Sequence, residues 1–330
     1  MTGSIALAAY RPDRELFAHQ LRSLQEQTMS DFECVISADG DAAGIAAAVD
    51  EVTGGDARFR VVGSDDRVGF YLNFERALRA VDPESAWVAL SDQDDVWYPD
   101  KLERLVPLLT DHTIASGQAR VVAYPSGREL TARTERRNTG PVELTAINEF
   151  SGAMSVFRRE VLELALPFPR VRTRVEVHDH WIAVCAAVLG PTVVLDETLQ
   201  EYVQHDGNVL GEPGRPTRLR LVSAWRTLTS MSRRIEGSAT PAAMARALYA
   251  MGYGWRTAMV TALVERRGAD DPTVARLNEV FGPDARLSAS VRRFFSSGDI
   301  DASNALMLAA GRLLDPFARA RFLSPGAVAR

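Results

Sequence analysis

Three acidic residues lie within four positions in the stretch SDQDDVW, directly after the apolar run 87–90: Asp92, Asp94 and Asp95. Carboxylates this close repel one another, so a partner must hold them together. A bound divalent cation is the simplest such partner, because hard oxygen ligands suit Mg²⁺ or Mn²⁺. The alternative is that the segment caps a following helix near Pro99, although capping needs one oxygen rather than three.

Common phosphate-binding loops are missing from the sequence. It contains no G-x-x-x-x-G-K-[ST] loop, which disfavours a P-loop nucleotidase. No G-x-G-x-x-G follows the first expected strand, which disfavours a dinucleotide enzyme. The two cysteines, Cys34 and Cys185, are too few for a disulfide framework or a cysteine metal site. The acidic cluster is therefore the main candidate for chemistry.

Alternating strands and helices must position this cluster. Short apolar runs indicate strands at 4–9, 32–38, 58–63 and 86–91. Amphipathic patterns between them indicate helices at 13–27, 43–52 and 69–81. This alternation favours βαβ units and a parallel sheet, and such sheets bind ligands at the carboxyl ends of their strands. Asp39 and the acidic cluster directly follow strands, so both lie where a site is expected.

The rest of the chain has a different character. Between 101 and 211 we expect a hairpin or irregular loop at 121–133, short helices at 143–149 and 158–166 around the strand GAMSVF, a helix at 176–189 and a strand at 191–197. Beyond 216 nearly every pattern is helical, including the long stretch 240–267. No internal repeat is present.

The charge is divided unevenly along the chain. Residues 212–330 hold 18 arginines and 10 acidic residues, which gives a net charge of +8. The whole chain has a net charge of −5, so residues 1–211 have a net charge of −13. The change falls near GEPGRP at 211–216, which is rich in glycine and proline. We therefore predict an acidic domain over 1–211 and a basic helical region over 212–330.

Composition points to an ordinary globular protein. The hydrophobic fraction is 46% and the charged fraction 25%. No apolar run reaches the roughly 18 residues that a transmembrane helix needs. The N-terminus lacks the features of a signal peptide. We expect a cytoplasmic protein.

Six short elements, in order, carry a resemblance to a known family: AAYRP, SADGD, RVGFYLNF, SDQDDVW, HDHW and YVQHDGN. This set, which spans residues 4 to about 211, resembles the family-2 glycosyltransferases with the GT-A fold, especially their rhamnosyltransferase-like branch. The resemblance implies a Rossmann-like, mostly parallel central sheet flanked by helices, here with an all-helical C-terminal extension. It also implies a nucleotide-binding half at 1–100 and an acceptor and catalytic half at 101–211.

The resemblance assigns residues to a nucleotide-diphosphate sugar and its metal. Tyr10 would stack on the base and Asp39 would accept a hydrogen bond from it, while Asp92 would lie near the ribose or the sugar. Asp94 would coordinate Mg²⁺ or Mn²⁺ with support from Asp95, and His205 would be a further ligand. The expected nucleotide-sugar-binding residues are Tyr10, Asp39, Arg67, Asn73, Asp92, Trp97, Gly152 and Trp181.

The element HDHW implies the catalytic base. Asp179 would deprotonate the acceptor hydroxyl on the face opposite the leaving diphosphate, and the implied outcome is inversion. His178 and Trp181 would orient the base and wall the sugar pocket, although Trp181 is equally compatible with the core. Asp179 also stands at the start of an expected helix, where an acid is favoured as a cap.

Several positions depart from the pattern of the family. Arg11 and Arg67 stand where the family usually shows Asn, and Ala38 stands where it shows the first acid of DDGS. The other departures are Asp41, His180 and Val203. Arg67 suits phosphate recognition, or it is a solvated loop residue. These changes bear on the donor more than on the fold.

Alternatives stay open at this point. The chain could be a non-catalytic binder of nucleotide sugars or glycans with the same fold. It could also be a metal phosphohydrolase that uses His178, Asp179 and His180, which could converge only if 178–180 is extended. The expected partners are a dTDP- or UDP-type sugar donor and a glycan or lipid-linked acceptor in cell-surface polysaccharide synthesis.

The arginine-rich C-terminal helices have two interpretations. One is contact with the inner face of a membrane, which would suit a lipid-linked acceptor. The other is a helical bundle that packs on the catalytic domain or forms a homodimer, which the dispersed charge favours. No nucleic-acid-binding motif is present and the whole chain is acidic, so nucleic acid is not an expected partner.

Overall fold

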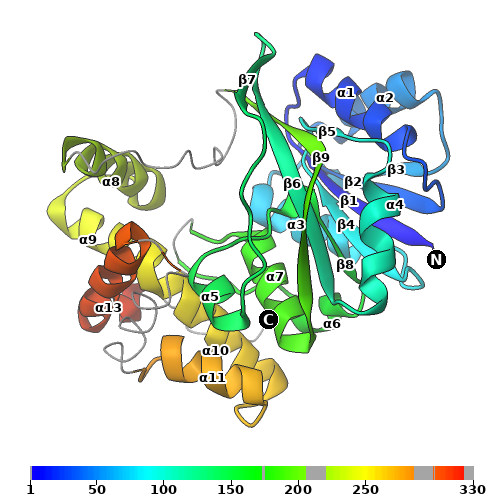
Figure 1. The fold of residues 1–330 in the computed structure, drawn as a ribbon. Coiled ribbons are helices and arrows are strands. Elements are labelled where there is room, and N and C mark those ends of the chain that lie inside the picture. Colours follow the sequence, from blue (N-terminus) through cyan, green and yellow to red (C-terminus); the bar gives the residue numbers. More distant parts are fainter. Residues whose placement is uncertain (1, 173–174, 206–220, 286–299, 301, 323–330) are drawn as a thin grey trace. The chain divides into compact units, whose positions relative to one another are not determined.

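The computed structural model describes residues 2–172, 175–205, 221–285, 300 and 302–322 (Figure 1). Contacts divide the chain into two compact units. The sheet unit comprises Met1–Asn138, Glu149–Leu166 and His178–Glu212. The helical unit comprises Thr139–Asn148, Pro167–Val177 and Pro213–Arg330. Two short segments from the first part of the sequence therefore belong to the helical unit.

One sheet runs through the sheet unit, in the strand order β3-β2-β1-β4-β8-β6-β9-β5, with β7 paired to β6. The strands around β1 pair in parallel, as the alternating pattern predicts, and β8 joins β4 antiparallel. The parallel strands are β1 (Gly3–Ala9), β2 (Phe32–Asp39), β3 (Phe59–Ser64) and β4 (Trp87–Ser91). The mixed, mostly parallel sheet with flanking helices confirms the expected fold class.

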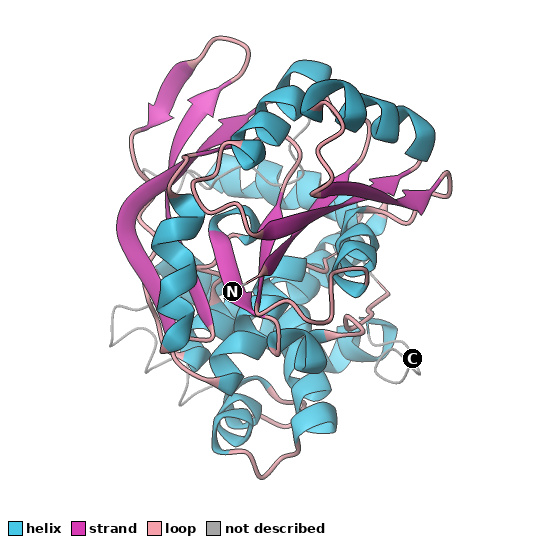
Figure 2. Ribbon diagram, turned by 90° about the vertical axis from the view of Figure 1, so that its right-hand side faces the viewer, coloured by secondary structure: helices cyan, strands magenta, loops and turns pink. Residues whose placement is uncertain are grey.

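The parallel strands are buried because helices lie along the sheet, as the magenta strands and cyan helices of Figure 2 show. Every residue of β4 is buried, which accounts for the apolar run 87–90. The helices that follow the first three strands are α1 (Arg14–Gln25), α2 (Ala42–Thr53) and α3 (Phe70–Arg79). The carboxylate of Asp13 caps α1 by accepting hydrogen bonds from the N–H groups of Glu15 and Leu16.

The second half of the sheet unit adds longer-range pairing. The predicted hairpin is present as β6 (Ile114–Ala123) and β7 (Arg128–Thr131). The predicted strand at 191–197 extends further, as β9 (Thr192–Gln204), and β5 (Val96–Trp97) pairs with it antiparallel. The remaining elements are α4 (Lys101–Leu105), η1 (Val106–Thr110), η2 (Gly152–Met154), β8 (Ser155–Arg158), α6 (Val161–Ala165) and α7 (His178–Leu189).

Beyond residue 220, the described part of the helical unit is mainly helical, as predicted for the C-terminal region, and α5 adds a helix from earlier in the chain. The helices are α5 (Pro141–Ala146), α8 (Leu221–Glu236), α9 (Pro241–Tyr249), η3 (Ala250–Gly254), α10 (Trp255–Arg267), α11 (Pro272–Phe281) and α13 (Ala302–Phe322). In the described ranges, no helix has the length and apolar character needed to cross a bilayer.

The long helical pattern at 240–267 is interrupted by the π-helical turn η3. A side-chain Cβ on Gly252 would lie only 2.4 Å from the carbonyl oxygen of Met307. A glycine is therefore required where this turn packs against α13. Within the same unit, the guanidinium of Arg256 donates to the carbonyl of Ala146, which ties α5 to α10.

Candidate active site

The acidic segment 92–95 connects two strands rather than starting a helix. It follows β4 and leads directly into β5, and the next helix, α4, begins only at Lys101. The N-cap position of α4 is Asp100, whose side chain makes no capping hydrogen bond. Helix capping therefore does not explain the three carboxylates.

Asp94 and His205 are brought together across 111 positions of sequence. The Nε2 atom of His205 lies 2.8 Å from Oδ2 of Asp94. The pairing of β5 with β9 explains this approach, because Val96 is in register with Glu201 and β9 ends just before His205. Burial raises the pKa of Asp94, and the hydrogen bond to His205 opposes that shift.

Asp95 faces β9 and not the same space as Asp94. Its Oδ2 accepts a hydrogen bond from Nε2 of Gln200 at 3.1 Å, and its Oδ1 accepts one from the N–H of Val203 at 3.2 Å. The side chain is fully buried. Burial and the charges of Asp94 and Asp92 hold its pKa well above the usual range. Asp95 fastens the acidic segment to β9.

Asp92 links the acidic segment to Asp179. Burial raises the pKa of Asp92 to about 7, and the negative charges of Asp94 and Asp179 add to that rise. Lys101 opposes it. The structure therefore gathers Asp92, Asp94 and Asp179 closely enough for their charges to interact.

Asp179 lies in the first turn of α7. Its Oδ2 accepts the N–H of Gly152 at 3.0 Å, and its Oδ1 accepts the N–H of His180 at 2.6 Å. A Cβ on Gly152 would lie 3.1 Å from Cβ of Asp179 and 3.2 Å from Nε2 of His178. Gly152 is thus the residue that permits the close approach of η2 to Asp179.

The triplet His178, Asp179 and His180 does not form a metal site. It is helical rather than extended, since α7 begins at His178. The ring of His178 stacks on Phe74 with a centroid distance of 3.8 Å, and burial lowers its pKa. Across the described residues, no three His, Cys, Asp or Glu side chains group to hold a metal ion by themselves. The hydrolytic alternative therefore loses its structural basis.

Tyr10 is tied to the acidic segment through its backbone. The N–H of Tyr10 donates to Oε1 of Gln93 at 2.7 Å, and Nε2 of Gln93 donates to the carbonyl of Tyr10 at 3.2 Å. Its ring has the guanidinium of Arg67 at 4.1 Å and that of Arg11 at 5.5 Å from the centroid. Gln93 thus fixes where the ring lies relative to Asp92 and Asp94.

The carboxylate of Asp39 is occupied by the segment before α3. It accepts hydrogen bonds from the N–H of Val68 at 2.5 Å and from the N–H of Gly69 at 2.9 Å. Arg76 lies 4.0 Å away. The two groups predicted to hold the base, Asp39 and Tyr10, therefore both contact the segment 67–69.

Residues 4–165 match the family model described as Glycosyl transferase family 2. Residues 4–165 belong to glycosyl transferase family 2. The dTDP-rhamnosyl transferase RfbG of Shigella flexneri is 39% identical over 59 residues, which are 17% of this chain and 20% of that protein. An uncharacterized glycosyltransferase of Nostoc, alr2836, is 30% identical over 131 residues, 37% of this chain and 40% of that protein.

Solved structures extend the comparison to the fold of the chain. TarS residues 1–349 of S. aureus, solved in complex with UDP-GlcNAc, superimposes with a TM-score of 0.53 at 13% identity and covers 95% of this chain and 92% of that one. This likeness confirms the GT-A fold. The matches to the two curated relatives span less than half the length of either protein.

Three of the predicted nucleotide-sugar-binding residues lie inside the sheet unit. Asn73 is buried, and its amide contacts Ser37 and the carbonyl of Ala9. Trp97 belongs to the core, and Trp181 is fully buried with its Nε1 donating to Ala165 at 2.8 Å. Their side chains are therefore packed in the interior of the sheet unit, where they support the residues of the candidate site.

Three polar residues of the candidate site were not among the residues predicted from the sequence: Gln93, Lys101 and Gln200. Gln93 stands inside the quoted motif, and its amide suits a two-way bond to a backbone, but its partner could not be read from sequence. Gln200 lies on a strand that was expected to end earlier. Lys101 has one signal, since it is the only lysine of the sequence.

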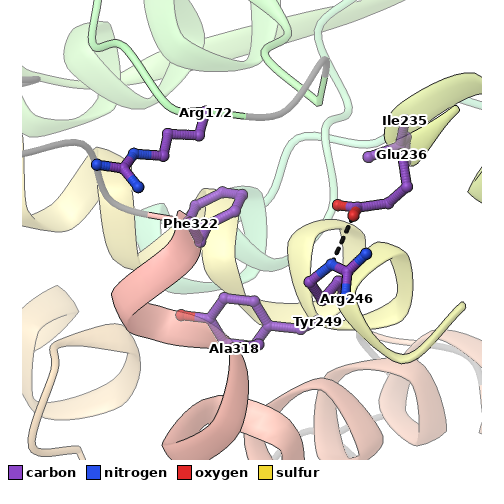
Figure 3. A pocket seen from close by; sticks show the side chains of 7 residues that line it. All are labelled: Arg172, Ile235, Glu236, Arg246, Tyr249, Ala318 and Phe322. Atoms are coloured by element: carbon purple, nitrogen blue, oxygen red, sulfur yellow. Dashed lines mark hydrogen bonds and ion pairs between the residues drawn. The ribbon is translucent and has the colours of Figure 1, made fainter. Parts of the chain in front are cut away.

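The helical unit contains a separate cavity of about 470 Å³ (Figure 3). Its described lining is Arg172, Ile235, Glu236, Arg246, Tyr249, Ala318 and Phe322. Figure 3 shows an ion pair between Arg246 and Glu236 in the lining of this cavity. The Nε atom of Arg246 lies 2.6 Å from Oε2 of Glu236. No predicted site residue lines this cavity.

Proposed function

We propose that the chain is an inverting, metal-dependent glycosyltransferase that uses a dTDP- or UDP-type sugar donor. The single observation that carries this proposal is the pairing of Asp94 with His205 beside Asp92 and Asp179. A glycosyl transfer needs a stabilised diphosphate on one face of the sugar and a base on the other. These residues offer groups for both tasks.

Asp94 and His205 would hold the divalent ion. A carboxylate oxygen and an imidazole nitrogen fit Mn²⁺, and Asp94 alone suits Mg²⁺. Neither ion needs a complete protein cage, because both usually take several ligands from water and substrate phosphates. When bound, the ion would stabilise the negative charge of the diphosphate leaving group. Asp95 would contribute by holding the acidic segment on β9 rather than as a ligand.

Tyr10, Asp39 and Arg67 would bind the nucleotide. The guanidinium of Arg67 lies over the Tyr10 ring, and the N–H groups of Val68 and Gly69 donate to Asp39. A base that stacks on Tyr10 and bonds to Asp39 would displace both contacts. Arg67 would then be free to meet the diphosphate, where a guanidinium binds well.

Asp179 would be the general base. Each of its oxygens accepts one backbone N–H, and an ionised carboxylate has about four acceptor sites, so capacity remains for an acceptor hydroxyl. Its two backbone bonds fix the carboxylate in place. A base of this kind is worth roughly 10²–10⁴ in rate.

The donor sugar, the acceptor and the setting are the finer parts of the proposal. The relative named as a dTDP-rhamnosyl transferase supports rhamnose as the first sugar to test. We propose a glycan or lipid-linked acceptor in cell-surface polysaccharide synthesis, in the cytoplasm or at the inner membrane face. Residues 1–100 would bind the nucleotide, 101–211 would bind the acceptor, and 212–330 would serve membrane contact or dimer formation.

A thermal-shift screen of nucleotide sugars tests this function. With Mn²⁺ present, UDP- or dTDP-sugars at about 100 times their Kd should stabilise the protein by roughly 2.7 kcal/mol, a rise of several degrees. ADP-ribose and NAD serve as controls and should give no shift. No response to any UDP- or dTDP-sugar would contradict the proposal. A non-catalytic binder would give the same shift without transferring sugar.

A further inference from the structure

Lys101 is the only lysine of the sequence, and it is completely buried. It is the first residue of α4, directly beyond the acidic segment and β5. An ammonium group is among the most costly groups to bury unless its donors are satisfied. Such a placement therefore calls for specific partners.

The ammonium of Lys101 contacts three partners: a backbone carbonyl, a side-chain amide and an aromatic ring. Its Nζ donates to the carbonyl of Ala153 at 2.5 Å and to Oε1 of Gln200 at 2.6 Å. On a third side it lies 3.4 Å from the centroid of the Trp97 ring, a cation–π contact. Its charge also opposes the rise that burial causes in the pKa of Asp95 and of Asp92.

The contact with Gln200 leads to the Asp94–His205 pair. Because Oε1 of Gln200 accepts from Lys101, its Nε2 is turned toward Asp95 and donates there at 3.1 Å. Asp95 in turn holds the N–H of Val203 on β9, two positions before His205. Lys101 thus fixes the strand that carries His205 against the segment that carries Asp94.

The contact with Ala153 leads to Asp179. Ala153 and Gly152 are adjacent in η2, and the N–H of Gly152 donates to Asp179 at 3.0 Å. The position of η2 therefore sets one of the two backbone bonds that hold the carboxylate. Lys101 is therefore connected to the Asp94–His205 pair and to Asp179 through other residues, without a hydrogen bond to any of the three.

We propose that Lys101 is a positioning residue that aligns the Asp94–His205 pair and Asp179 through Gln200 and Ala153. This inference rests on the proposed function, because it concerns the geometry of that site. Residues that hold metal ligands from behind typically change metal affinity or activity by about 10- to 100-fold when they are replaced. A lysine that served only the core would not affect binding beyond its effect on stability.

Two variants separate these roles. Lys101→Met keeps the aliphatic stem and removes the donors, while Leu105→Ala removes buried contacts from the same helix without touching the network. Calorimetry with UDP and Mn²⁺ should show about 10- to 100-fold weaker binding for Lys101→Met. Leu105→Ala should bind like the wild type even if it melts at a lower temperature. Equal binding by the two variants would overturn the proposal.

The double variant Lys101→Met with Gln200→Leu tests the first branch. Each change breaks the same hydrogen bond, the one between Lys101 and Gln200, so the two losses of affinity should not add. The combined loss should be close to that of Lys101→Met alone. A loss equal to the product of the two single losses would overturn the role of Gln200.

A measurement on protein that keeps Lys101 covers the case in which Lys101→Met fails to fold. Protein labelled with ¹³Cε-lysine gives one lysine signal, because the chain has a single lysine. That signal should shift when UDP and Mg²⁺ saturate the protein, and the shift should shrink in Gln200→Leu. A wild type that binds UDP with an unmoved lysine signal would overturn the proposal. A wild type that fails to bind UDP or dTDP at all would instead contradict the proposed function.

Discussion

The guanidinium of Arg67 lies 4.1 Å above the centre of the Tyr10 ring. The same segment donates two backbone hydrogen bonds to Asp39. Residues 67–69 therefore contact both of the groups that are predicted to hold the base. In the proposed binding mode, a nucleotide would replace these internal contacts with contacts to the ligand.

Arg67→Ala should strengthen the binding of a nucleoside without phosphates. An exposed cation–π contact is worth about 0.5–1 kcal/mol, so its removal should raise uridine or thymidine affinity by roughly two- to fivefold. Titration followed by NMR measures such weak binding. Arg14→Ala is the control, since Arg14 is exposed and pairs with Glu51. Weaker nucleoside binding in Arg67→Ala would mean that the guanidinium supports the base instead of covering its place.

Arg11→Asn should stabilise the protein. Arg11 has a φ of 41°, in the left-handed region, where most residues with a Cβ lose about 1–2 kcal/mol. Asn tolerates this conformation, so the free energy of unfolding should rise by about 1 kcal/mol in urea titrations. Arg11→Ala removes the same side chain without that tolerance and should show no gain. An equal result for both variants would remove backbone strain as the explanation.

Asp179→Asn should separate binding from chemistry. The amide cannot take the proton of the acceptor, so transfer should fall by roughly 10²–10⁴ while UDP affinity with Mn²⁺ stays within about threefold. Its NH₂ group would face one of the two backbone donors, so the free energy of unfolding should fall by about 1 kcal/mol.

Glu176→Gln is the matched control for Asp179→Asn, because Glu176 is a nearby acid that also accepts a backbone N–H. It should transfer sugar normally. If Asp179→Asn keeps more than about a tenth of the wild-type rate, Asp179 is not the base.

Gly152→Ala should reduce transfer while leaving a folded protein. The added Cβ would lie 3.1 Å from Cβ of Asp179, so the carboxylate must move by a few tenths of an ångström or more. A misplacement of about 1 Å can cost about 100-fold in rate, so this smaller shift should lower the rate by less than that. In Gly140→Ala the new Cβ meets only the flexible end of Glu143, and activity should not change. Normal transfer by Gly152→Ala would show that Asp179 tolerates displacement.

Local patterns predicted the elements and the edge of the sheet where the site lies. Asp39 and Asp94 follow predicted strands, and parallel strands end at one edge, so their general placement could be read from the sequence. The approach of His205 to Asp94 could not be derived this way. It depends on the length of β9 and on its register with β5, which are long-range properties.

Burial is what the motifs could not reveal. Three residues that stand in or near motif elements are buried: Trp97, Trp181 and Asn73. A motif gives residue types only. It does not show whether a side chain contacts the ligand or packs behind another residue that does. A lysine is normally read as a surface residue. The burial of Lys101 depends on Ala153 and Gln200, which lie 52 and 99 positions away in sequence.

Calorimetric titration of UDP and dTDP, with Mn²⁺ and with EDTA, tests most directly whether Asp94 and His205 hold a diphosphate through a divalent ion. We predict that the wild type binds at least one of the two nucleotides about tenfold or more tightly with Mn²⁺, and that Asp94→Asn loses this difference. Asp100→Asn, which changes an exposed acid nearby, should keep it. If the wild type binds UDP as tightly in EDTA as in Mn²⁺, and the same holds for dTDP, the metal site is contradicted.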